Sequence, residues 1–540
     1  MLAKTLNLEL ISQTRLHPSQ PPPQSCTQPL STIDSTVLRF TPAGAIWIYD
    51  APTQIPYSPS NILTSLRKAL SYYPQWCGQL CWTPFNPSLG HANRCQRVQL
   101  TWGSPDDPGV EVVVTHSSST ISEILPDAAE RSKGPWEPAS FPSHELFPAT
   151  NLAFVDASTC EGLPGMIIQL TTFECGALAI AVKMAHVLAD AQTLNTFMKD
   201  WANLHRDPLF TPSPMFSPST LSYRASGNID APSPDPTLLA TANSVSRTRY
   251  DYYAPTPFAP SWAQSAMTPP PELANSTLAA PGIPPPWELW DQSAPAKKVV
   301  LHFTAAEILA IHAASTPNGE KISQHAALVS HIWLSLLHAR ATSESSAMAS
   351  ETEAKKERSG LAHLTLTLSL RPRVTPPLPT NFLGSPIVHA AASIPFPEPS
   401  PGPGRPSSSG LSLPDTATAL TKALATFDEE RVAALLHEAA FDDWSTRYWN
   451  SVLGTRNVIV TSWVRAGVWD VDFGGGRCRY VEPLMPEVDG LVVVMEAGLR
   501  REGGKEGTGH WAEHGVDVLV SARAEVVDEL VGGGMVGRFR

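Results

Sequence analysis

The chain is predicted to fold as two α/β domains joined by a proline-rich linker. Its 540 residues exceed what one hydrophobic core of ordinary size holds, so two cores are expected. Segments with strand-like and helix-like patterns alternate in both halves. From residue 224 to residue 296, proline, serine and other small residues crowd out any apolar period. We therefore expect an N-terminal domain over residues 1–223, a crossover linker over residues 224–296 and a C-terminal domain over residues 297–540.

The N-terminal half begins with a helical pattern and continues with strands. In residues 61–73 the apolar side chains fall at helical spacing. Residues 110–114 and 166–170 are short apolar runs, which predict strands. Residues 177–182 form a continuous apolar run after Gly176, as expected of a buried strand.

The C-terminal half shows the same mixture. Residues 323–341 carry apolar side chains at helical spacing, and residues 364–368 and 458–461 have strand patterns. Two further stretches rich in proline and serine, residues 343–360 and 395–412, are predicted to be insertions or linkers.

Charge and cysteine usage narrow the class of partner. The net charge is −12 and no run of five basic residues occurs, which argues against a nucleic-acid or anionic-membrane surface and favours a small-molecule partner. Seven scattered cysteines without CxxC spacing predict reduced core thiols. No signal-peptide core and no stretch of ~18 consecutive apolar residues is present, so we expect a cytoplasmic protein without a membrane span. We also expect a monomer.

His186 lies between the predicted strand of residues 177–182 and a helix that Asp190 is placed to cap. The apolar face of that helix comprises Leu194, Phe197, Met198, Trp201 and Leu204. A histidine in such a turn is held by rigid elements and can project into a cleft, as a general base must. With 16 histidines in the chain, His-x-x-x-Asp also arises by chance, so an ordinary core histidine and a simple helix cap remain open. No third ligand stands at useful spacing, so no metal is expected.

A second marker follows Thr461-Ser462-Trp463. It is Asp472-Phe473-Gly474-Gly475-Gly476, whose glycines predict a tight turn. The P-loop lysine, the strand–GxGxxG–helix layout and a preceding kinase HRD loop are all missing, so no nucleotide site is predicted here.

Taken together, these segments resemble the BAHD family of acyl-CoA-dependent acyltransferases over nearly the whole chain outside the proline-rich stretches. The matching segments, in order, are Leu30-Ser31-Thr32-Ile33-Asp34 (LSxxD), residues 63–70 leading to Tyr73-Pro74, Phe173-Glu174-Cys175-Gly176 leading to His186 and Asp190, residues 322–340, Leu370-Arg371-Pro372-Arg373, Thr461-Ser462-Trp463 and Asp472-Phe473-Gly474. Three positions depart from the family pattern. Ala191 replaces the glycine of HxxxDG, Gly475 replaces the tryptophan of DFGWG, and Ser385 replaces the asparagine of YFGN.

The resemblance implies two similar domains related to chloramphenicol acetyltransferase, with a substrate channel between them. Acyl-CoA would enter from one face as a co-substrate and the acceptor from the other, with no cofactor bound. The resemblance also implies that a part near residues 487–515 packs on the N-terminal domain.

The resemblance assigns catalytic roles to four residues. His186 would take the proton of the acceptor, and Asp190 would orient the loop through an arginine. Thr461 would donate to the oxyanion while Trp463 walls the acceptor pocket, although simple packing at the end of a strand explains these two residues as well.

The remaining site residues would bind coenzyme A or hold the structure. Ser323 would lie near the pantetheine or phosphate, although a helix N-cap explains it equally well. Asp472 would be structural and paired with Arg371. The other residues of this structural motif are Phe473, Gly474 and Gly476.

Direct transfer of an acyl group, acetyl by family frequency, to a hydroxyl or amine of a secondary metabolite is the expected reaction. The chain has no Gly-x-Ser-x-Gly elbow beside His186, which favours direct transfer over a serine acyl-enzyme. A condensation-domain relative acting on carrier-bound acyl groups is one alternative, although Ala185 stands where such proteins have a second histidine. An inactive relative that binds a ligand is the other.

Overall fold

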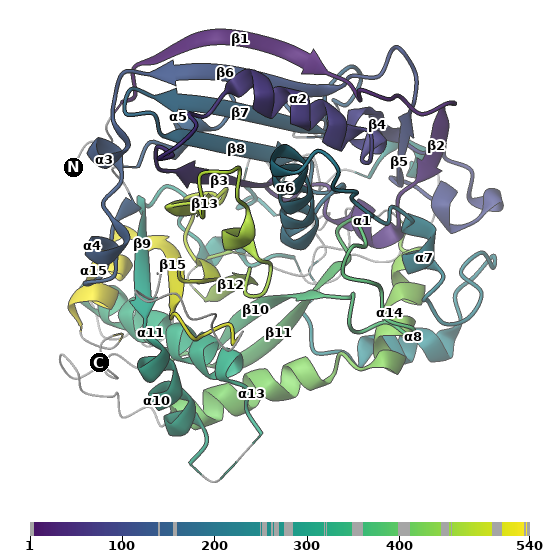
Figure 1. The fold of residues 1–540 in the computed structure, drawn as a ribbon. Helices are drawn as coiled ribbons and strands as arrows, with labels where there is room; N and C mark the ends of the chain where they lie inside the picture. Colours follow the sequence, from purple (N-terminus) through teal and green to yellow (C-terminus); the bar gives the residue numbers. More distant parts are fainter. Residues whose placement is uncertain are drawn as a thin grey trace.

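A computed structural model describes residues 5–138, 141–154, 159–248, 250, 256–260, 263, 269–274, 284–317, 319, 321–347, 360–397, 411–443, 453–454, 456–498, 510–533 and 536. Two six-stranded mixed sheets dominate this part of the chain and occupy the upper and lower halves of Figure 1. Most of the N-terminal half builds the first sheet, and the C-terminal half builds the second.

The first sheet has the strand order β1-β6-β7-β8-β3-β13. The strands are β1 (Leu8–Leu16), β6 (Val110–Ser117), β7 (Met166–Phe173), β8 (Leu178–Met184), β3 (Ala43–Tyr49) and β13 (Tyr480–Pro483). β6 and β7 are parallel, and the other neighbours are antiparallel. Alternate residues of β8, such as Ile180 and Val182, pack with helices α2 (Pro59–Leu70) and α6 (Ala191–Arg206). We call this hydrophobic cluster the first core. The other face of β8 is also buried, which agrees with the continuous apolar run from Leu178 to Val182; Lys183 is the one charged residue of the strand.

β13 belongs to the first sheet although it lies late in the chain. It pairs with β3, with Val481 opposite Trp47. The residues before it, including Trp463 and Phe473, pack into the first core. We expected the part near residues 487–515 to pack on the N-terminal domain. Residues 491–496 form β14 of the second sheet, and Val493 and Met495 of this strand pack into the core of the first sheet. Residues 499–509 lie outside the described residues.

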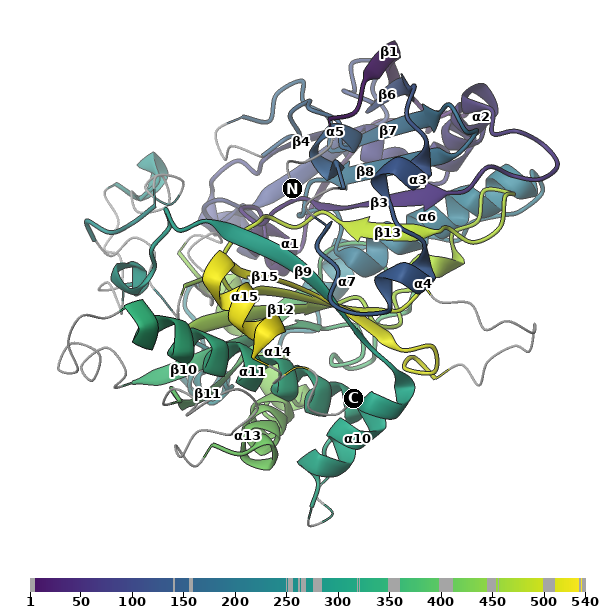
Figure 2. The same cartoon turned by 90° about the vertical axis from the view of Figure 1, so that its left-hand side faces the viewer.

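The second sheet has the order β11-β10-β12-β14-β15-β9. Its strands are β11 (Ile387–Pro395), β10 (Leu361–Ser369), β12 (Asn457–Ser462), β14 (Leu491–Glu496), β15 (Val516–Arg523) and β9 (Ala296–Phe303). Helices α10 (Ala305–Ser315), α11 (Gln324–Ala347), α13 (Leu413–Ala425) and α15 (Ala524–Gly532) cover the face turned away from the first sheet (Figures 1 and 2). Val458 and Val460 point into the core under these helices, whereas Val493 points into the first core. The opposite face of the second sheet is thus turned toward the N-terminal half.

Shorter elements connect and flank the sheets. The third sheet comprises β2 (Cys26–Pro29), β5 (Val98–Trp102) and β4 (Gln79–Trp82). The remaining α-helices are α1 (Thr32–Thr36), α3 (Ile121–Ile124), α4 (Ala128–Arg131), α5 (Ser143–Leu146), α7 (Pro218–Ser222), α8 (Pro236–Asn243) and α14 (Glu429–Phe441). Short 3₁₀ turns span Pro74–Cys77, Pro87–Leu89, His91–Asn93, Pro271–Leu273, Trp287–Leu289 and Val468–Asp470.

Four of the five predicted strands lie within β6, β7, β10 and β12, and the fifth, residues 177–182, overlaps β8. The helical patterns of residues 61–73 and 323–341 overlap α2 and α11. The predicted linker, residues 224–296, is more structured than expected, because helix α8 forms within it. Its last residue, Ala296, is the first residue of strand β9. Residues 348–359 and 398–410, which hold most of the other two predicted insertions, lie outside the described residues.

Two further expectations bear on the surface. No helix in the described part of the chain is long and apolar enough to cross a membrane. The seven cysteines are free thiols. Cys77, Cys95 and Cys478 are buried as predicted, but Cys175 is exposed because it occupies the turn between β7 and β8 rather than a strand interior.

Candidate active site

His186 occupies the turn between β8 and α6, as the sequence predicts. The turn is tight, with the Leu188 amide donating to the Ala185 carbonyl oxygen. The turn also packs closely on the preceding chain, since a Cβ atom at Gly165 would lie 2.7 Å from a methyl carbon of Leu188. The His186 side chain keeps some solvent exposure although its surroundings are buried. This position satisfies the first demand on a general base, which is to be held by rigid elements and still reach a substrate.

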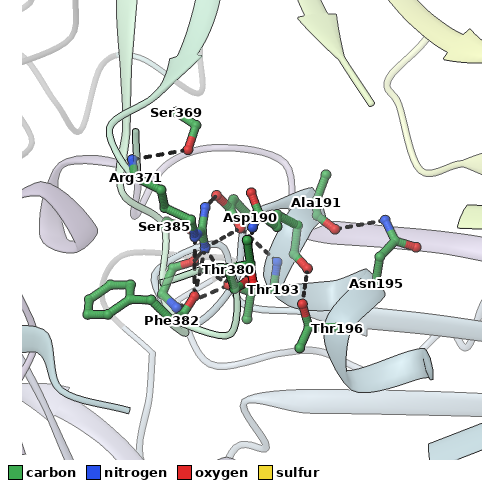
Figure 3. A network of polar contacts seen from close by, with 12 residues as sticks. Asp190, Ala191, Thr193, Asn195, Thr196, Ser369, Arg371, Thr380, Phe382 and Ser385 are labelled. Carbon is green, nitrogen blue, oxygen red and sulfur yellow. Dashed lines mark hydrogen bonds and ion pairs between the residues drawn. The ribbon is translucent and has the colours of Figure 1, made fainter. Parts of the chain in front are cut away.

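Asp190 caps α6 and binds Arg371 (Figure 3). One carboxylate oxygen of Asp190 accepts from the Thr193 amide at 2.9 Å. Two guanidinium nitrogens of Arg371 donate to the two carboxylate oxygens, at 2.5 and 3.0 Å. Both side chains are buried, so this bidentate pair links the two halves of the chain away from water. The arginine that the resemblance implies for Asp190 is thus Arg371.

The pairing expected for Arg371 is wrong. We expected Asp472 to bind it, but Asp472 lies 3.3 Å from Arg206 at a partly exposed site. The reason is geometric, because Arg371 follows β10 on the side of the second sheet that meets the start of α6, whereas residue 472 packs near the end of α6.

The loop of residues 382–385 docks on the start of α6 through the same network. Thr193 donates its hydroxyl hydrogen to the Gly384 carbonyl oxygen at 2.8 Å, and the Asp190 amide donates to that oxygen at 3.2 Å. Gly384 adopts a φ of 132°, and a Cβ atom there would lie 2.9 Å from Asp34. Glycine is therefore required at this position, because it permits both the backbone conformation and the close approach.

Ser385 contacts the imidazole of His186. Its Oγ donates to the backbone carbonyl oxygen of His186 and lies 3.2 Å from Nδ1. Because a hydroxyl carries a single hydrogen, Oγ acts as the acceptor at Nδ1. This assigns the hydrogen of neutral His186 to Nδ1 and leaves a lone pair on Nε2. Ser385 itself is completely buried.

Asp34 binds the backbone of Ser385 through its carboxylate. The Ser385 amide donates to one carboxylate oxygen of Asp34 at 2.6 Å, and the Ser31 amide and hydroxyl donate to the other, at 3.0 and 2.6 Å. Ser31 and Asp34 also form the capping box of α1. The LSxxD segment thus supports the residue beside His186. Burial raises the pKa of Asp34 to about 6, even though these hydrogen bonds act in the opposite direction.

The pKa of His186 is lowered from its ordinary value of 6.5. Burial is the main cause, because it disfavours the imidazolium ion. A hydrogen bond to the residue's own carbonyl group and the charge of Asp190 act in the opposite direction but are weaker. His186 is therefore neutral at pH 7 and able to accept a proton.

Thr461 and Trp463 lie on the same side of the second sheet as the N-terminal half. Thr461 is partly exposed near the end of β12, and no hydrogen bond of its side chain to another described residue is found. Trp463 is 3% exposed and packs in the first core, and its amide donates to the Val494 carbonyl oxygen. Within the part of the chain that the structure describes, no hydrogen bond or ring contact joins either side chain to His186.

Ser323 lies immediately before α11. Its Oγ accepts from the Ala326 amide at 3.0 Å, which is the contact of a helix N-cap. The side chain is exposed. Its contacts therefore match the helix-cap alternative, and a role in binding coenzyme A rests on the family resemblance.

Asp472 closes the turn that its glycines form. One carboxylate oxygen accepts from the amides of Gly474 and Gly476, at 2.8 and 2.9 Å. Both glycines have positive φ, at 95° and 92°. Phe473 then points into the first core, where its ring meets Trp201 edge-on at 4.9 Å between centroids. These contacts anchor a C-terminal segment on the N-terminal half.

Tyr57 occupies the space next to Gly475. A Cβ atom at Gly475 would lie 1.9 Å from the Tyr57 hydroxyl oxygen. That oxygen is buried without a hydrogen-bond partner among the described residues. The absence of the family's tryptophan at position 475 thus coincides with an aromatic ring supplied from another loop.

Sequence reasoning missed three residues around His186. Phe40 meets the imidazole edge-on, with 5.4 Å between ring centroids. Ser385 was noted only as a departure from YFGN, and His389 was not singled out. The only feature of the sequence that could have indicated Phe40 is its position six residues after Asp34, the last residue of the LSxxD segment. Among the described residues, no group of three or more metal-binding side chains occurs.

A family model described as the Transferase family matches residues 6–506. The chain belongs to this family, the BAHD acyltransferases. This BAHD acyltransferase is 27% identical to acyltransferase AFT15-1 of Alternaria alternata, over 84% of this chain and 83% of that protein. Vinorine synthase shares the fold with a TM-score of 0.59 and 16% identity, over 98% of each chain. TRI101 of F. sporotrichioides, solved with coenzyme A and T-2, has a TM-score of 0.59 and 15% identity, over 94% of this chain and 97% of its own. The predicted two-domain fold related to chloramphenicol acetyltransferase is confirmed.

Proposed function

We propose that this BAHD acyltransferase transfers an acyl group, acetyl in the first instance, from acyl-CoA directly to a hydroxyl or amine of a small secondary metabolite, with His186 as the general base. The observation that carries the proposal is the contact of Ser385 with Nδ1. It leaves the lone pair of neutral His186 on Nε2. A base must present such a lone pair to the acceptor.

In the proposed reaction one proton moves from the acceptor to His186 and then from His186 to the leaving thiolate. His186 Nε2 takes the proton of the acceptor O–H or N–H as that atom forms a bond to the thioester carbonyl carbon. The resulting tetrahedral oxyanion collapses and the C–S bond breaks. The imidazolium ion then returns the proton to the leaving thiolate of coenzyme A. The products are the acylated acceptor and free coenzyme A, and His186 is neutral again.

Ser385 does not act as a nucleophile in this proposal. It is completely buried and its hydrogen is engaged with the His186 carbonyl oxygen, so a thioester cannot reach it. This supports direct transfer over an acyl-enzyme intermediate. Asp190 positions the turn through Arg371 and takes no part in proton transfer.

Thr461 is proposed to donate a hydrogen bond to the oxyanion. Trp463 is proposed to form a wall of the acceptor pocket. The free hydroxyl of Thr461 on the face turned toward the N-terminal half supports the first role. Ser323, at the exposed start of α11, is proposed to lie near the coenzyme A tail. The solved complex of TRI101 with coenzyme A and T-2 supports acyl-CoA as the co-substrate and a small molecule as the acceptor. Both would meet His186 between the two halves.

A thioester-consumption assay tests the reaction class. Purified protein is mixed with acetyl-, malonyl- or benzoyl-CoA and a panel of alcohols and amines, and release of the coenzyme A thiol is followed. We expect acceptor-dependent release with acetyl-CoA. Transfer only from a carrier protein would favour the condensation-domain alternative, and binding without turnover would favour an inactive relative.

We also propose a cytoplasmic monomer, for which size-exclusion chromatography should give a mass near 58.2 kDa.

A further inference from the structure

A row of polar side chains crosses the face of the second sheet that is turned toward the N-terminal half. His389 on β11 is paired with Thr367 on β10. Thr367 and Thr461 directly follow Leu366 and Val460, which pair between β10 and β12. The neighbours of His389 along its strand, Val388 and Ala390, point into the opposite core. Paired residues share a face, so the His389, Thr367 and Thr461 side chains emerge together.

His389 lies beside the catalytic turn. Its ring stacks on Phe40 with 5.4 Å between centroids and an interplanar angle of 18°. The same Phe40 ring meets His186 edge-on at 5.4 Å. Both imidazoles therefore contact the same aromatic ring. His389 as a whole is 8% exposed.

The polar atoms of this row have no protein partners in the described part of the chain. Neither ring nitrogen of His389 has a hydrogen bond there, and the same holds for the hydroxyls of Thr367 and Thr461. Other histidines of this sheet differ, since His363 contacts Ser393 at 2.7 Å and His302 contacts Asp517 at 2.8 Å. Thr367 and Thr461 are partly exposed and the His389 nitrogens keep some solvent contact, so these unpaired groups are accessible to a polar ligand beside His186.

We propose that His389 is a specificity-determining residue that hydrogen-bonds a second oxygen of the acceptor, next to the one that is acylated. The acceptor class would be a diol or a hydroxy-ketone rather than a simple alcohol. This inference rests on the proposed role of His186. Burial and the neighbouring His186 lower the pKa of His389 to about 4, so the ring is neutral at pH 7 and offers one donor and one acceptor. Thr367 supplies a further hydroxyl on the same face.

Binding can be tested without turnover. Protein labelled with ¹³C at histidine Cε1 is titrated with trans-1,2-cyclohexanediol or with cyclohexanol, and the two signals are assigned with His186→Ala and His389→Phe. We expect the diol to shift both signals and cyclohexanol to shift mainly that of His186. A His389 signal that responds equally to both probes, or to neither, would overturn the proposal.

Kinetics give the second test. Among panel alcohols that turn over, those with a second oxygen on the adjacent carbon should be preferred by about tenfold or more in kcat/KM. His389→Phe keeps the stacking on Phe40 but removes both nitrogens, so it should abolish the preference, whereas His389→Gln should retain part of it. His363→Ala is the matched control on the same sheet and should change nothing. A preference that survives His389→Phe contradicts this inference, whereas an active His186→Ala contradicts the proposed function instead.

Discussion

Arg371 holds both carboxylate oxygens of Asp190, at 2.5 and 3.0 Å, and so ties the start of α6 to the loop that follows β10. The same guanidinium donates to the Phe382 carbonyl oxygen at 3.1 Å. The turn that carries His186 and the loop that carries Ser385 are thereby held in one arrangement. We propose that Asp190 affects the chemistry through this arrangement.

Asp190→Asn should destabilise the protein more than the loss of the base does. Breaking a buried ion pair by removing one charge typically costs about 3 to 5 kcal/mol, because the other charge stays buried. The melting temperature should fall clearly for Asp190→Asn and stay near wild type for His186→Ala. Arg206→Ala, which removes an exposed pair, is the control and should have little effect. Equal melting temperatures for Asp190→Asn and wild type would show that the pair is dispensable.

Asp472→Ala should reduce stability and soluble yield before it reduces catalysis. The carboxylate closes the turn of Gly474 and Gly476, and its loss leaves two amides without their acceptor. We expect a destabilisation of about 1 to 3 kcal/mol, measured by denaturant unfolding. A purified variant that melts like wild type but has lost kcat by more than about a hundredfold would rule out a structural role.

Gly475→Trp should be strongly destabilising in the wild-type background and much less so in Tyr57→Ala. The family's tryptophan cannot enter while the Tyr57 hydroxyl lies where its Cβ would be. The backbone is no obstacle, since Gly475 is not among the glycines with positive φ. A double-mutant cycle on melting temperature measures the coupling. Additive effects of the two substitutions would show that Tyr57 does not replace the tryptophan.

The predictable part of the fold was the part with strong local periodicity. β8 and α6 were predicted because a continuous apolar run and an apolar helix face are local signals. β13 was not placed, since Tyr480–Pro483 is four residues long and its partner β3 lies far earlier in the chain. Helix α8 was not predicted because it has only eight residues, of which Ala242 alone is buried, and its contacts are mostly with α14.

The site was predictable to the level of the strand, turn and cap. His186 and Asp190 follow from that local pattern and from the resemblance. The partner of Arg371 was assigned wrongly, because an ion pair between the two halves depends on how they dock. His389 carried no sequence signal at all, since a single histidine in an apolar strand resembles any satisfied core histidine.

The acid limb of the pH-rate profile should lie below pH 6.5. Burial lowers the pKa of His186, so protonation removes the base only at more acidic pH than for a free imidazole. Asp34, with a pKa raised to about 6, titrates in the same range, and Asp34→Asn separates the two groups. The limb should remain in Asp34→Asn. A limb at or above pH 6.5, or one that disappears with Asp34, would mean that His186 does not control it.

The most direct test of the account is His186→Ala, measured for chemistry and for acyl-CoA binding in the same preparation. General-base catalysis typically contributes about 10²- to 10⁴-fold, so kcat should fall by that factor. The Kd for acyl-CoA, measured by calorimetry, should stay within a few-fold of wild type, because the imidazole holds the acceptor proton and not the donor. A His186→Ala enzyme that keeps more than about a tenth of wild-type kcat, with an unchanged acid limb, would remove His186 from the mechanism.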